Sequence, residues 1–277
     1  MKFAYQGIPG SYSESCIKKN YPNCEETISC RTFQDAFELA KNNNNVKALV
    51  PDQNQLIGSI NIETLILKYR LNITAEHFFP INHSLLVLPG TKLKDIKDVY
   101  SHTAALSQTN SFLRKNNLNE NVMADTAGSA AFISRTKDKT KAAIASKEAG
   151  KIYNLEVLNS DIQDEKENFT RFLVFQKDIE QPVFTKNNNY ITSFLFKLKN
   201  KPSALFQSLT GLSLRQVDMT KLQSFPEKGT FTSYYFFCEV QGHIDEEKIS
   251  GALSDLELHC SEFQLLGVFE QSNFRNR

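Results

Sequence analysis

The sequence predicts an α/β fold in which a large two-lobed domain precedes a smaller α/β domain. Three observations carry this prediction. In residues 1–178, short apolar runs typical of strands alternate with segments of helical periodicity. Residues 190–270 follow the order strand, helix, strand, strand, helix, strand. Residues 179–189 between them are polar and contain a proline and an asparagine run, as is typical of a linker.

The first lobe is expected to begin with a strand, Phe3–Tyr5, and a helix that starts at a capping box formed by Ser11 and Glu14. A second helix over 32–42 carries its apolar side chains on one face. A strand over 46–50 then stops at a proline. The further elements expected up to residue 88 are a helix after Gly58-Ser59 and strands over 73–79 and 83–88.

The same alternation continues through the middle of the chain and returns in a strand over 172–175. One lobe, about residues 1–79 and 165–178, is thus interrupted by a second, about 80–164. This arrangement resembles the type II periplasmic binding proteins, with the ligand in the cleft between the lobes. In the second lobe, the helices are expected to start at about residues 91, 104, 127 and 147. The strands are expected over 99–100, 122–123 and 142–145.

The last domain is expected to be ferredoxin-like, because of its β-α-β-β-α-β order. It resembles an ACT domain, a regulatory module that often binds amino acids at a dimer interface. The elements expected here are strands over 190–198, 219–224, 233–240 and 263–269, and helices over 203–215 and 246–256.

Composition excludes several function classes. The 32 basic and 31 acidic residues leave a net charge of +1, which gives no overall field toward nucleic acid or an anionic membrane. No apolar run approaches the length of a membrane span, and the N-terminus lacks the regions of a signal peptide. The five cysteines have neither C-x-x-C spacing nor a nearby histidine pair, so no zinc site or disulfide framework is expected. We therefore expect a cytoplasmic protein with a small-molecule or protein partner.

The most informative segment is the polar turn Asn168–Phe172, which leads into an apolar strand. It brings an amide, a hydroxyl and a guanidinium together at the mouth of a strand, which suits a small organic anion. Arg171 could clamp a carboxylate with two hydrogen bonds or brace the turn, and both roles stay open.

Two further segments join a strand to a capped helix. Gly7–Ser13 brings free backbone N–H groups and hydroxyls to one place. Asp125–Ala130 repeats the device, since its small residues let backbone amides approach a ligand and Thr126 or Ser129 can donate a hydrogen bond. Two such helix ends, one in each lobe, would suit a substrate with two carboxylates.

These motifs resemble those of the prephenate dehydratases over nearly the whole chain. The turn matches the family signature N-x-T-R-F, and the two helix starts match its G-x-x-G and D-T-A-x-A segments. The resemblance implies an enzyme of phenylalanine biosynthesis that converts prephenate to phenylpyruvate. The substrate-binding residues it implies are Ser11, Ser13, Asn54, Gln108, Thr126, Ala127, Asn168, Arg171 and Phe172.

Thr170 resembles the family residue assigned to the leaving hydroxyl. The family's reaction expels the C4 hydroxyl and the side carboxylate of prephenate together and forms an aromatic ring, so the resemblance implies no cofactor. Because an alcohol is a poor general acid near neutral pH, we expect Thr170 to donate a hydrogen bond that strengthens as charge develops. His83, beside a strand, is expected to be a core or lobe-crossing residue.

Three positions depart from the family's pattern. In the segment that resembles V-P-I-E-N-S-x-x-G-S, Asn54 is kept, while Gln53 and Gln55 replace glutamate and serine. In the segment that resembles S-H-P-Q-A-L-x-Q, Gln108 is kept and Ala104 replaces a glutamine. An amide can hydrogen-bond but cannot titrate, so these changes bear on substrate affinity and activity.

The small domain carries two segments that resemble effector motifs. Residues 201–206 resemble P-G-A-L and residues 222–226 resemble E-S-R-P, with Ser203 in place of glycine and Phe225 in place of arginine. The resemblance implies phenylalanine as an effector and assembly into a homodimer or homotetramer. The effector-binding residues would be Ser203, Ala204, Leu205, Phe206, Gln223 and Ser224.

Two alternatives stay open. A catalytically silent relative would bind an amino acid or a keto acid without turnover, and the departures at the two sites motivate it. An arogenate dehydratase would act on the amino-acid analogue of prephenate. Because the two substrates differ only at the keto or amino carbon, the sequence pattern does not choose between them.

Overall fold

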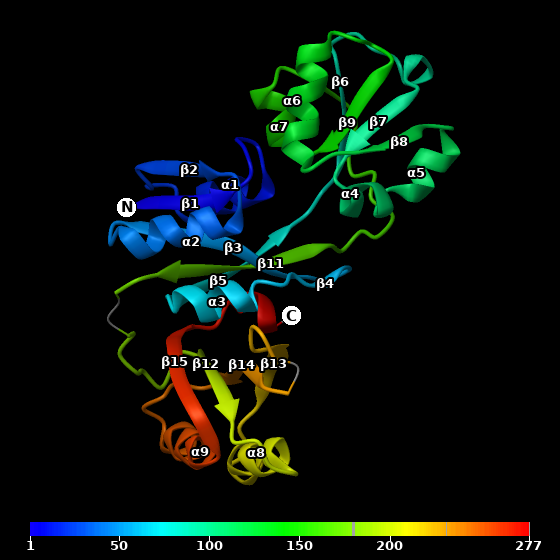
Figure 1. Cartoon of the computed structure of the whole chain (residues 1–277). Helices are drawn as coiled ribbons and strands as arrows, with labels where there is room; N and C mark the ends of the chain where they lie inside the picture. The colour runs from blue at the N-terminus through cyan, green and yellow to red at the C-terminus, as the bar shows by residue number, and fades with distance from the viewer. Residues whose placement is uncertain (179–180, 231, 277) are drawn as a thin grey trace. The chain divides into compact units, whose positions relative to one another are not determined.

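The computed structural model describes residues 1–178, 181–230 and 232–276 and confirms a mixed α/β fold (Figure 1). Within these residues the strands form three sheets. The chain divides into two compact units, each described here by itself. The first unit holds residues 1–39, 45–60 and 77–172, and the second holds 40–44, 61–76 and the chain from Leu173 onward. Residues 179 and 180 of the predicted linker lie outside the described residues.

The first sheet contains β1 (Lys2–Gln6), β2 (Glu26–Cys30), β3 (Val46–Asn54), β4 (Gly58–Ser59), β5 (Asn72–Pro80) and β11 (Phe169–Gln176). Its strand order is β2-β1-β3-β11-β5, with β4 paired to β3. The first strand runs parallel to both of its neighbours. The helices α1 (Tyr12–Asn20), α2 (Phe33–Asn42) and α3 (Glu63–Tyr69) alternate with these strands, as the sequence predicted.

The second sheet contains β6 (Ser84–Val87), β7 (Asp98–Ser101), β8 (Asn119–Val122), β9 (Lys141–Ala145) and β10 (Glu156–Asn159), in the order β10-β6-β9-β7-β8. The strand β7 is parallel to β8 and β9, whereas β6 is antiparallel to β9 and β10. The helical segments of this region are η1 (Leu93–Asp95), α4 (Thr103–Ser107), α5 (Asn110–Lys115), α6 (Thr126–Thr136) and α7 (Lys147–Ile152).

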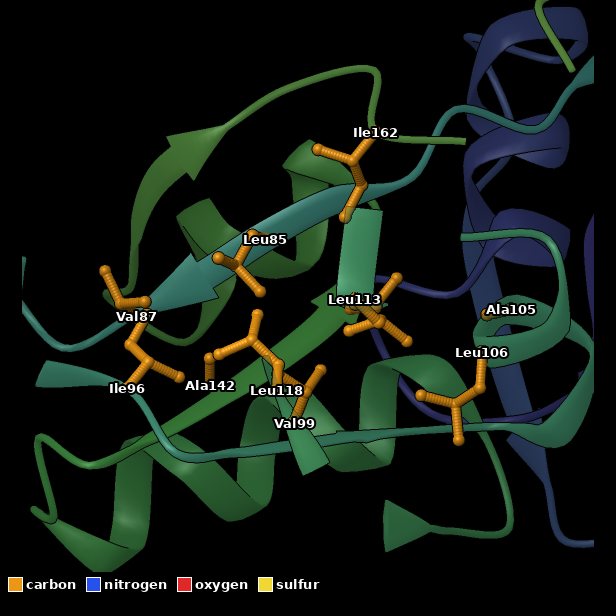
Figure 2. Close-up of a cluster of buried hydrophobic side chains, with 11 residues drawn as sticks. Leu85, Val87, Ile96, Val99, Ala105, Leu106, Leu113, Leu118, Ala142 and Ile162 are labelled. Carbon is orange, nitrogen blue, oxygen red and sulfur yellow. The ribbon is translucent and has the colours of Figure 1, made fainter. Parts of the chain in front are cut away.

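The central strands β6 and β9 of this second sheet are buried on both faces. Along β6, Leu85 and Val87 contribute to one apolar cluster, which Figure 2 shows, while Leu86 contributes to another. Alternate side chains of a strand point to opposite faces, so an uninterrupted apolar run fits a sheet covered on both sides. The run Ala142–Ala145 in β9 divides between the clusters in the same way.

The sequence missed the two-residue strand β4, and it also missed β2 and β10. Both strands lie at an edge of their sheets and carry several exposed residues, so neither shows an apolar run or strict alternation. Pairing with one neighbour decides their conformation instead.

The sequence also predicted one helix from about residue 104, where the structure has two short ones. The break follows Gln108, the C-cap of α4. The hydroxyl of Thr109 donates to the backbone carbonyl of Ala105 at 2.8 Å and also bonds that of Leu106. Such side-chain bonds compete with the helical ladder, and here they accompany the end of α4.

The third sheet belongs to the second unit and has the order β13-β14-β12-β15. Its strands are β12 (Tyr190–Leu198), β13 (Met219–Pro226), β14 (Tyr234–Gln241) and β15 (Cys260–Glu270), and its helices are α8 (Ala204–Leu214) and α9 (Glu247–Leu258). A short segment, η2 (Asn273–Asn276), follows. All three strand pairs are antiparallel, and the chain order matches the predicted β-α-β-β-α-β pattern. Phe194 and Phe196 anchor the core between this sheet and its helices.

Across the described ranges, the helices are too short or too polar for any of them to cross a membrane.

Candidate active site

A cavity of about 390 Å³ lies within the first compact unit. Small-molecule sites typically span ~300–1,000 Å³, so this volume suits a metabolite. Three predicted site residues, Ala127, Asn168 and Arg171, are buried and do not line it. The predicted residues that do line it are Ser11, Ser13, Asn54, Gln108, Thr126, Thr170 and Phe172.

The loop before α1 forms one wall of the cavity. Gly10 has φ +90°, and a Cβ on it would lie 2.8 Å from the Cα of Ala149, so the loop requires glycine there. The hydroxyl of Ser146 donates to the carbonyl of Gly10 at 2.7 Å. Ser11 then caps α1 by accepting from the N–H of Glu14. Because the first N–H groups of a helix lie outside its own ladder, this end of α1 offers donors to an anion.

Glu14 holds the same loop through its side chain. The sequence predicted it as the glutamate of a capping box, and the structure differs in the N–H group that it bonds. Instead of reaching the N–H of Ser11, as in a full capping box, its carboxylate accepts from the N–H of Gly10 at 2.7 Å. It also pairs with Lys18 at 2.7 Å. Burial raises the pKa of this carboxyl, but the hydrogen bonds from Lys18 and Gly10 outweigh burial and lower its pKa overall.

The start of α6 forms a second wall. The carboxylate of Asp125 accepts from the N–H of Gly128 at 2.6 Å and so caps this helix. Ser129, one of the two hydroxyls considered from the sequence, is fully buried and donates to the backbone carbonyl of Asp125. Thr126 is therefore the hydroxyl that this helix brings to the cavity.

Asn54, at the end of β3, has an amide whose orientation is fixed by the backbone. Its Oδ1 accepts from the N–H groups of Leu56 and Ile57, both at 3.0 Å. A backbone N–H can only donate, so the other terminal atom of this amide is the NH₂ nitrogen. That nitrogen donates to Oδ1 of Asn168 at 2.8 Å and to Oγ1 of Thr170 at 2.9 Å.

Thr170 therefore accepts a hydrogen bond from Asn54 and keeps its own hydroxyl hydrogen for a different partner. Its side chain lines the cavity from near the start of β11, and the residue is only 6% exposed. A ligand in the cavity would meet a hydroxyl that is already prepared to donate.

A second set of contacts leads from the same turn to His83. The NH₂ of Asn168 donates to Oε1 of Gln108 at 3.0 Å, and Nε2 of His83 lies 2.9 Å from the same oxygen. On the other side of the ring, Nδ1 lies 3.0 Å from the hydroxyl of Tyr12. Burial lowers the pKa of His83, although its bond to Gln108 acts in the opposite direction.

His83 is thus buried, as expected, but it also lines the cavity and belongs to a hydrogen-bonded chain. Tyr12 was not among the predicted residues. Its position between two serines of the G-x-x-G segment was the one available signal, and spacing alone cannot reveal a partner that lies seventy-one residues away.

Arg171 adopts one of the two roles that the sequence left open. Its Nη1 lies 2.9 Å from Oδ2 of Asp52, and the two side chains are 4% and 0% exposed. This buried ion pair ties β11 to β3, so the geometry favours the brace over a carboxylate clamp. Asp52 was missed because nothing in the sequence pairs it with a residue so distant.

The departures from the family pattern fall into two groups. Gln53 and Gln55 are exposed and do not line the cavity, so their side chains lie away from a bound ligand. Ala104 does line the cavity, beside Ala105. The replacement of glutamine by alanine there removes an amide from the wall.

The charge of the cavity wall is unusual for an anion site. In the described part of the chain, no lysine or arginine lines the cavity, and Asp125 supplies its one carboxylate. The imidazoles of His83 and His102 and the phenol of Tyr12 are its other titratable groups. An anion would have to be held by neutral donors, namely hydroxyls, amides and helix N–H groups. Elsewhere in those residues, no cluster of three or more His, Cys, Asp or Glu side chains could hold a metal ion.

The second unit has its own cavity, of about 550 Å³, near the start of α8. The predicted residues Ser203, Ala204, Leu205 and Phe206 line it, together with Lys197, Lys199 and Lys201. Gln223 and Ser224 do not. Phe225, in place of the family's arginine, is buried and stacks on Tyr235 with ring centroids 6.0 Å apart.

Ser203 itself has φ +61°, in the left-handed region, which glycine adopts without strain.

Comparison with known proteins links this chain to one family. Residues 3–180 match the family described as prephenate dehydratase. The Arabidopsis thaliana protein named arogenate dehydratase/prephenate dehydratase 2, chloroplastic, is 34% identical over 280 residues, which are 97% of this chain and 72% of the relative.

A relative from Komagataeibacter europaeus, named bifunctional N-acyl-homoserine lactone acylase/prephenate dehydratase, is 30% identical over 275 residues, covering 99% of this chain and 97% of the relative. The solved structure of prephenate dehydratase from Arthrobacter aurescens in complex with L-Phe has the same fold, with a TM-score of 0.88 and 24% identity over 98% of this chain and 90% of that one.

Proposed function

The chain belongs to the prephenate dehydratase family, whose members are lyases, and on that premise we propose that it converts prephenate to phenylpyruvate in L-phenylalanine biosynthesis. The observation that carries this proposal is the prepared hydroxyl of Thr170. Its oxygen already accepts from Asn54 at 2.9 Å, so its hydrogen is available to a leaving group in the cavity.

The chemistry needs that donor. The bond between the ring and the carboxylate breaks, its electron pair completes the aromatic ring, and the C4–O bond breaks to release hydroxide. One prephenate dianion thus gives phenylpyruvate, carbon dioxide and hydroxide, which takes a proton to become water. Negative charge develops on the departing oxygen, and a preorganised hydrogen bond stabilises that charge most in the transition state.

The remaining groups would bind and orient the substrate. We propose that its carboxylates meet the N-terminus of α1 near Ser11 and Ser13, the hydroxyl of Thr126 and the amide of Gln108. Phe172 would contact the ring, since its side chain lines the same cavity. Asn168 and Arg171 would act indirectly. They would position the site through the hydrogen bond of Asn168 with Asn54 and the ion pair of Arg171 with Asp52. Ala127 would act through its backbone in the first turn of α6.

Arogenate is a second candidate substrate, and one observation favours it. Arogenate carries an ammonium where prephenate has a keto oxygen, and Asp125 is the one carboxylate on the described cavity wall. The cap bond to Gly128 uses Oδ1 of Asp125, so Oδ2 could meet a cation. A wall that carries an anion and no lysine or arginine suits a substrate with a positive group.

We further propose a division into a catalytic domain over 1–178, a linker over 179–189 and an ACT domain over 190–270. The large domain would consist of one lobe at about 1–79 and 165–178 and another at about 80–164. The separate core of the third sheet supports the small domain. The cytoplasm remains the proposed compartment, supported by five cysteines that are all free.

Phenylalanine is the proposed effector of the small domain, and a homodimer or homotetramer the proposed assembly. The L-Phe complex of the Arthrobacter aurescens relative supports the ligand class. Ser203 lines the second cavity at a left-handed φ, so its backbone is strained and its side chain would lie beside a ligand bound there.

Replacement of Thr170 by alanine should remove the donor to the leaving hydroxyl. We expect kcat for prephenate to fall by roughly 10²–10³ or more, with KM changed little, while Thr170→Ser should stay within about tenfold of the unmodified protein. Phenylpyruvate release measured with purified protein tests this. Near-normal kcat in the alanine variant would refute the role of Thr170, and no turnover by the unmodified protein at high concentration would favour the catalytically silent relative.

The choice of substrate can be tested at Asp125. Asparagine also caps helices, so Asp125→Asn should keep α6 while it removes the charge. If arogenate is the substrate, its kcat/KM should fall by about tenfold or more, and that of prephenate should stay equal or rise. Asp35→Asn is the matched control, because that carboxylate bonds the N–H of Thr32 outside the cavity. Equal losses for both substrates would argue against an ammonium contact.

The regulatory site can be tested by calorimetry with L-phenylalanine. We expect the unmodified protein to bind it, and Ser203→Gly to bind it more tightly, because glycine relieves the left-handed strain and clears the helix end. Gln216→Gly is the matched control, since Gln216 has φ +52° but does not line the cavity. Absence of binding in all three proteins would oppose the effector. Light scattering in the same buffer should give at least twice 31.5 kDa, and a monomer would oppose the assembly.

A further inference from the structure

We propose that Tyr12 and His83 are positioning residues that hold the Gln108 amide with its NH₂ group toward the cavity, where it donates to a substrate carboxylate. The role in turnover rests on the proposed function. The orientation itself follows from hydrogen-bond polarity and does not depend on which substrate is used.

The polarity begins at the backbone. The N–H groups of Leu56 and Ile57 fix Oδ1 of Asn54 as an acceptor, so the nitrogen of Asn54 donates to Oδ1 of Asn168. The other terminal atom of Asn168 is then its NH₂ nitrogen, and it donates to Gln108 at 3.0 Å. The atom of Gln108 at this contact must therefore be the oxygen.

The same oxygen also determines the tautomer of His83. Since Oε1 of Gln108 can only accept, Nε2 of His83, at 2.9 Å, must carry a hydrogen. Burial favours the neutral ring, in which Nδ1 is then an acceptor. The hydroxyl of Tyr12, 3.0 Å away, is the group that this nitrogen meets, and an acceptor Nδ1 can take only a share of the single hydroxyl hydrogen.

Tyr12 thus ends the chain. Its one hydroxyl hydrogen is shared between two acceptors, the backbone carbonyl of Asn82, to which it donates at 2.7 Å, and Nδ1 of His83 at 3.0 Å. Its ring meets the imidazole edge-on, with centroids 5.8 Å apart and planes at 80°. Ring packing and hydrogen bond together restrict the His83 ring. Without the hydroxyl, Nδ1 would lose its donor, and the ring could adopt the other tautomer by turning Nδ1–H toward Asn82.

The consequence falls on Gln108. With its oxygen held by two donors, its NH₂ group is left for the cavity that the residue lines. Two N–H donors suit one carboxylate, and the described wall offers no lysine or arginine for that purpose. If the tautomer of His83 changed, Oε1 would keep only the Asn168 donor and would face the lone pair of Nε2. The amide would then be held less firmly, and rotation by 180° would present an oxygen to the substrate anion.

The chain contains a close match to this pair that can serve as a control. Tyr21 and His77 lie in the same unit, with the hydroxyl 2.8 Å from Nε2 and the rings edge-on at 5.2 Å. Neither residue lines the cavity. Tyr21→Phe therefore removes the same kind of bond without touching Gln108.

The test compares prephenate kinetics for the full-length protein, Tyr12→Phe, Tyr21→Phe, Gln108→Ala and the double variant Tyr12→Phe/Gln108→Ala. We expect Tyr12→Phe to raise KM by about tenfold with kcat changed by less than about threefold, since a lost carboxylate contact weakens binding of substrate and transition state alike. Tyr21→Phe should leave both constants within about twofold. In the Gln108→Ala background, Tyr12→Phe should add nothing, because its effect acts through Gln108.

Two results would overturn the proposal: an unchanged KM in Tyr12→Phe, or effects of the two substitutions that multiply. A ¹⁵N NMR spectrum of the His83 ring, assigned by its absence in His83→Gln, gives a readout that needs no substrate. The proposal requires the Nε2–H tautomer in the unmodified protein and its loss or mixing in Tyr12→Phe. An Nδ1–H tautomer in the unmodified protein would refute the proposal even if turnover is normal, whereas the expected tautomer without turnover would refute only the proposed function.

Discussion

Two backbone N–H groups, those of Leu56 and Ile57, fix the direction of the hydrogen bonds on which the site depends. They hold one atom of the Asn54 amide as an acceptor, and each later partner must then donate or accept in turn. One branch ends at the hydroxyl of Thr170 and the other at Gln108. The loop that follows β3 thus determines which atoms donate and which accept in four buried or half-buried side chains. They are those of Asn54, Asn168, Thr170 and Gln108.

This arrangement explains how a site without lysine or arginine on its described wall could accept an anionic substrate. Neutral donors cost less to bury than an unpaired charge, and they need little reorganisation when negative charge develops. The guanidinium of Arg171, in the signature turn, does not line the cavity. It forms a buried ion pair with Asp52 that braces β11 against β3. Glu14 serves the Gly10 loop in a similar way, as a buried charge with several hydrogen bonds.

Much of the fold could be predicted from the sequence, because it depends on local signals. Strand and helix alternation, the cap at Ser11 and the order of the last six elements were all confirmed. The edge strands β2 and β10 were missed, since their conformation comes from pairing and not from an apolar pattern.

The candidate site divides in the same way. The residues of the N-x-T-R-F turn and of the helix starts could be named from the family resemblance that these motifs carry, and most of them line one cavity. The roles of these residues could not be predicted, because they depend on contacts between residues 71 to 119 positions apart. These contacts are Asn54 with Thr170, Arg171 with Asp52 and His83 with Tyr12. Which atom of an amide faces a ligand depends on such contacts.

The central claim is that the NH₂ of Asn54 leaves the hydroxyl hydrogen of Thr170 free for the substrate, and Asn54→Asp tests it with almost no change in shape. A carboxylate still accepts from the two loop N–H groups, but it cannot donate, so the Thr170 hydroxyl would turn to bond it. The Asn168 amide would turn as well, which acts on KM through Gln108, so kcat is the constant that reports on Thr170. In prephenate turnover by purified protein of unchanged melting temperature, the account predicts a loss of kcat as large as that of Thr170→Ala. Near-normal kcat in Asn54→Asp would contradict it.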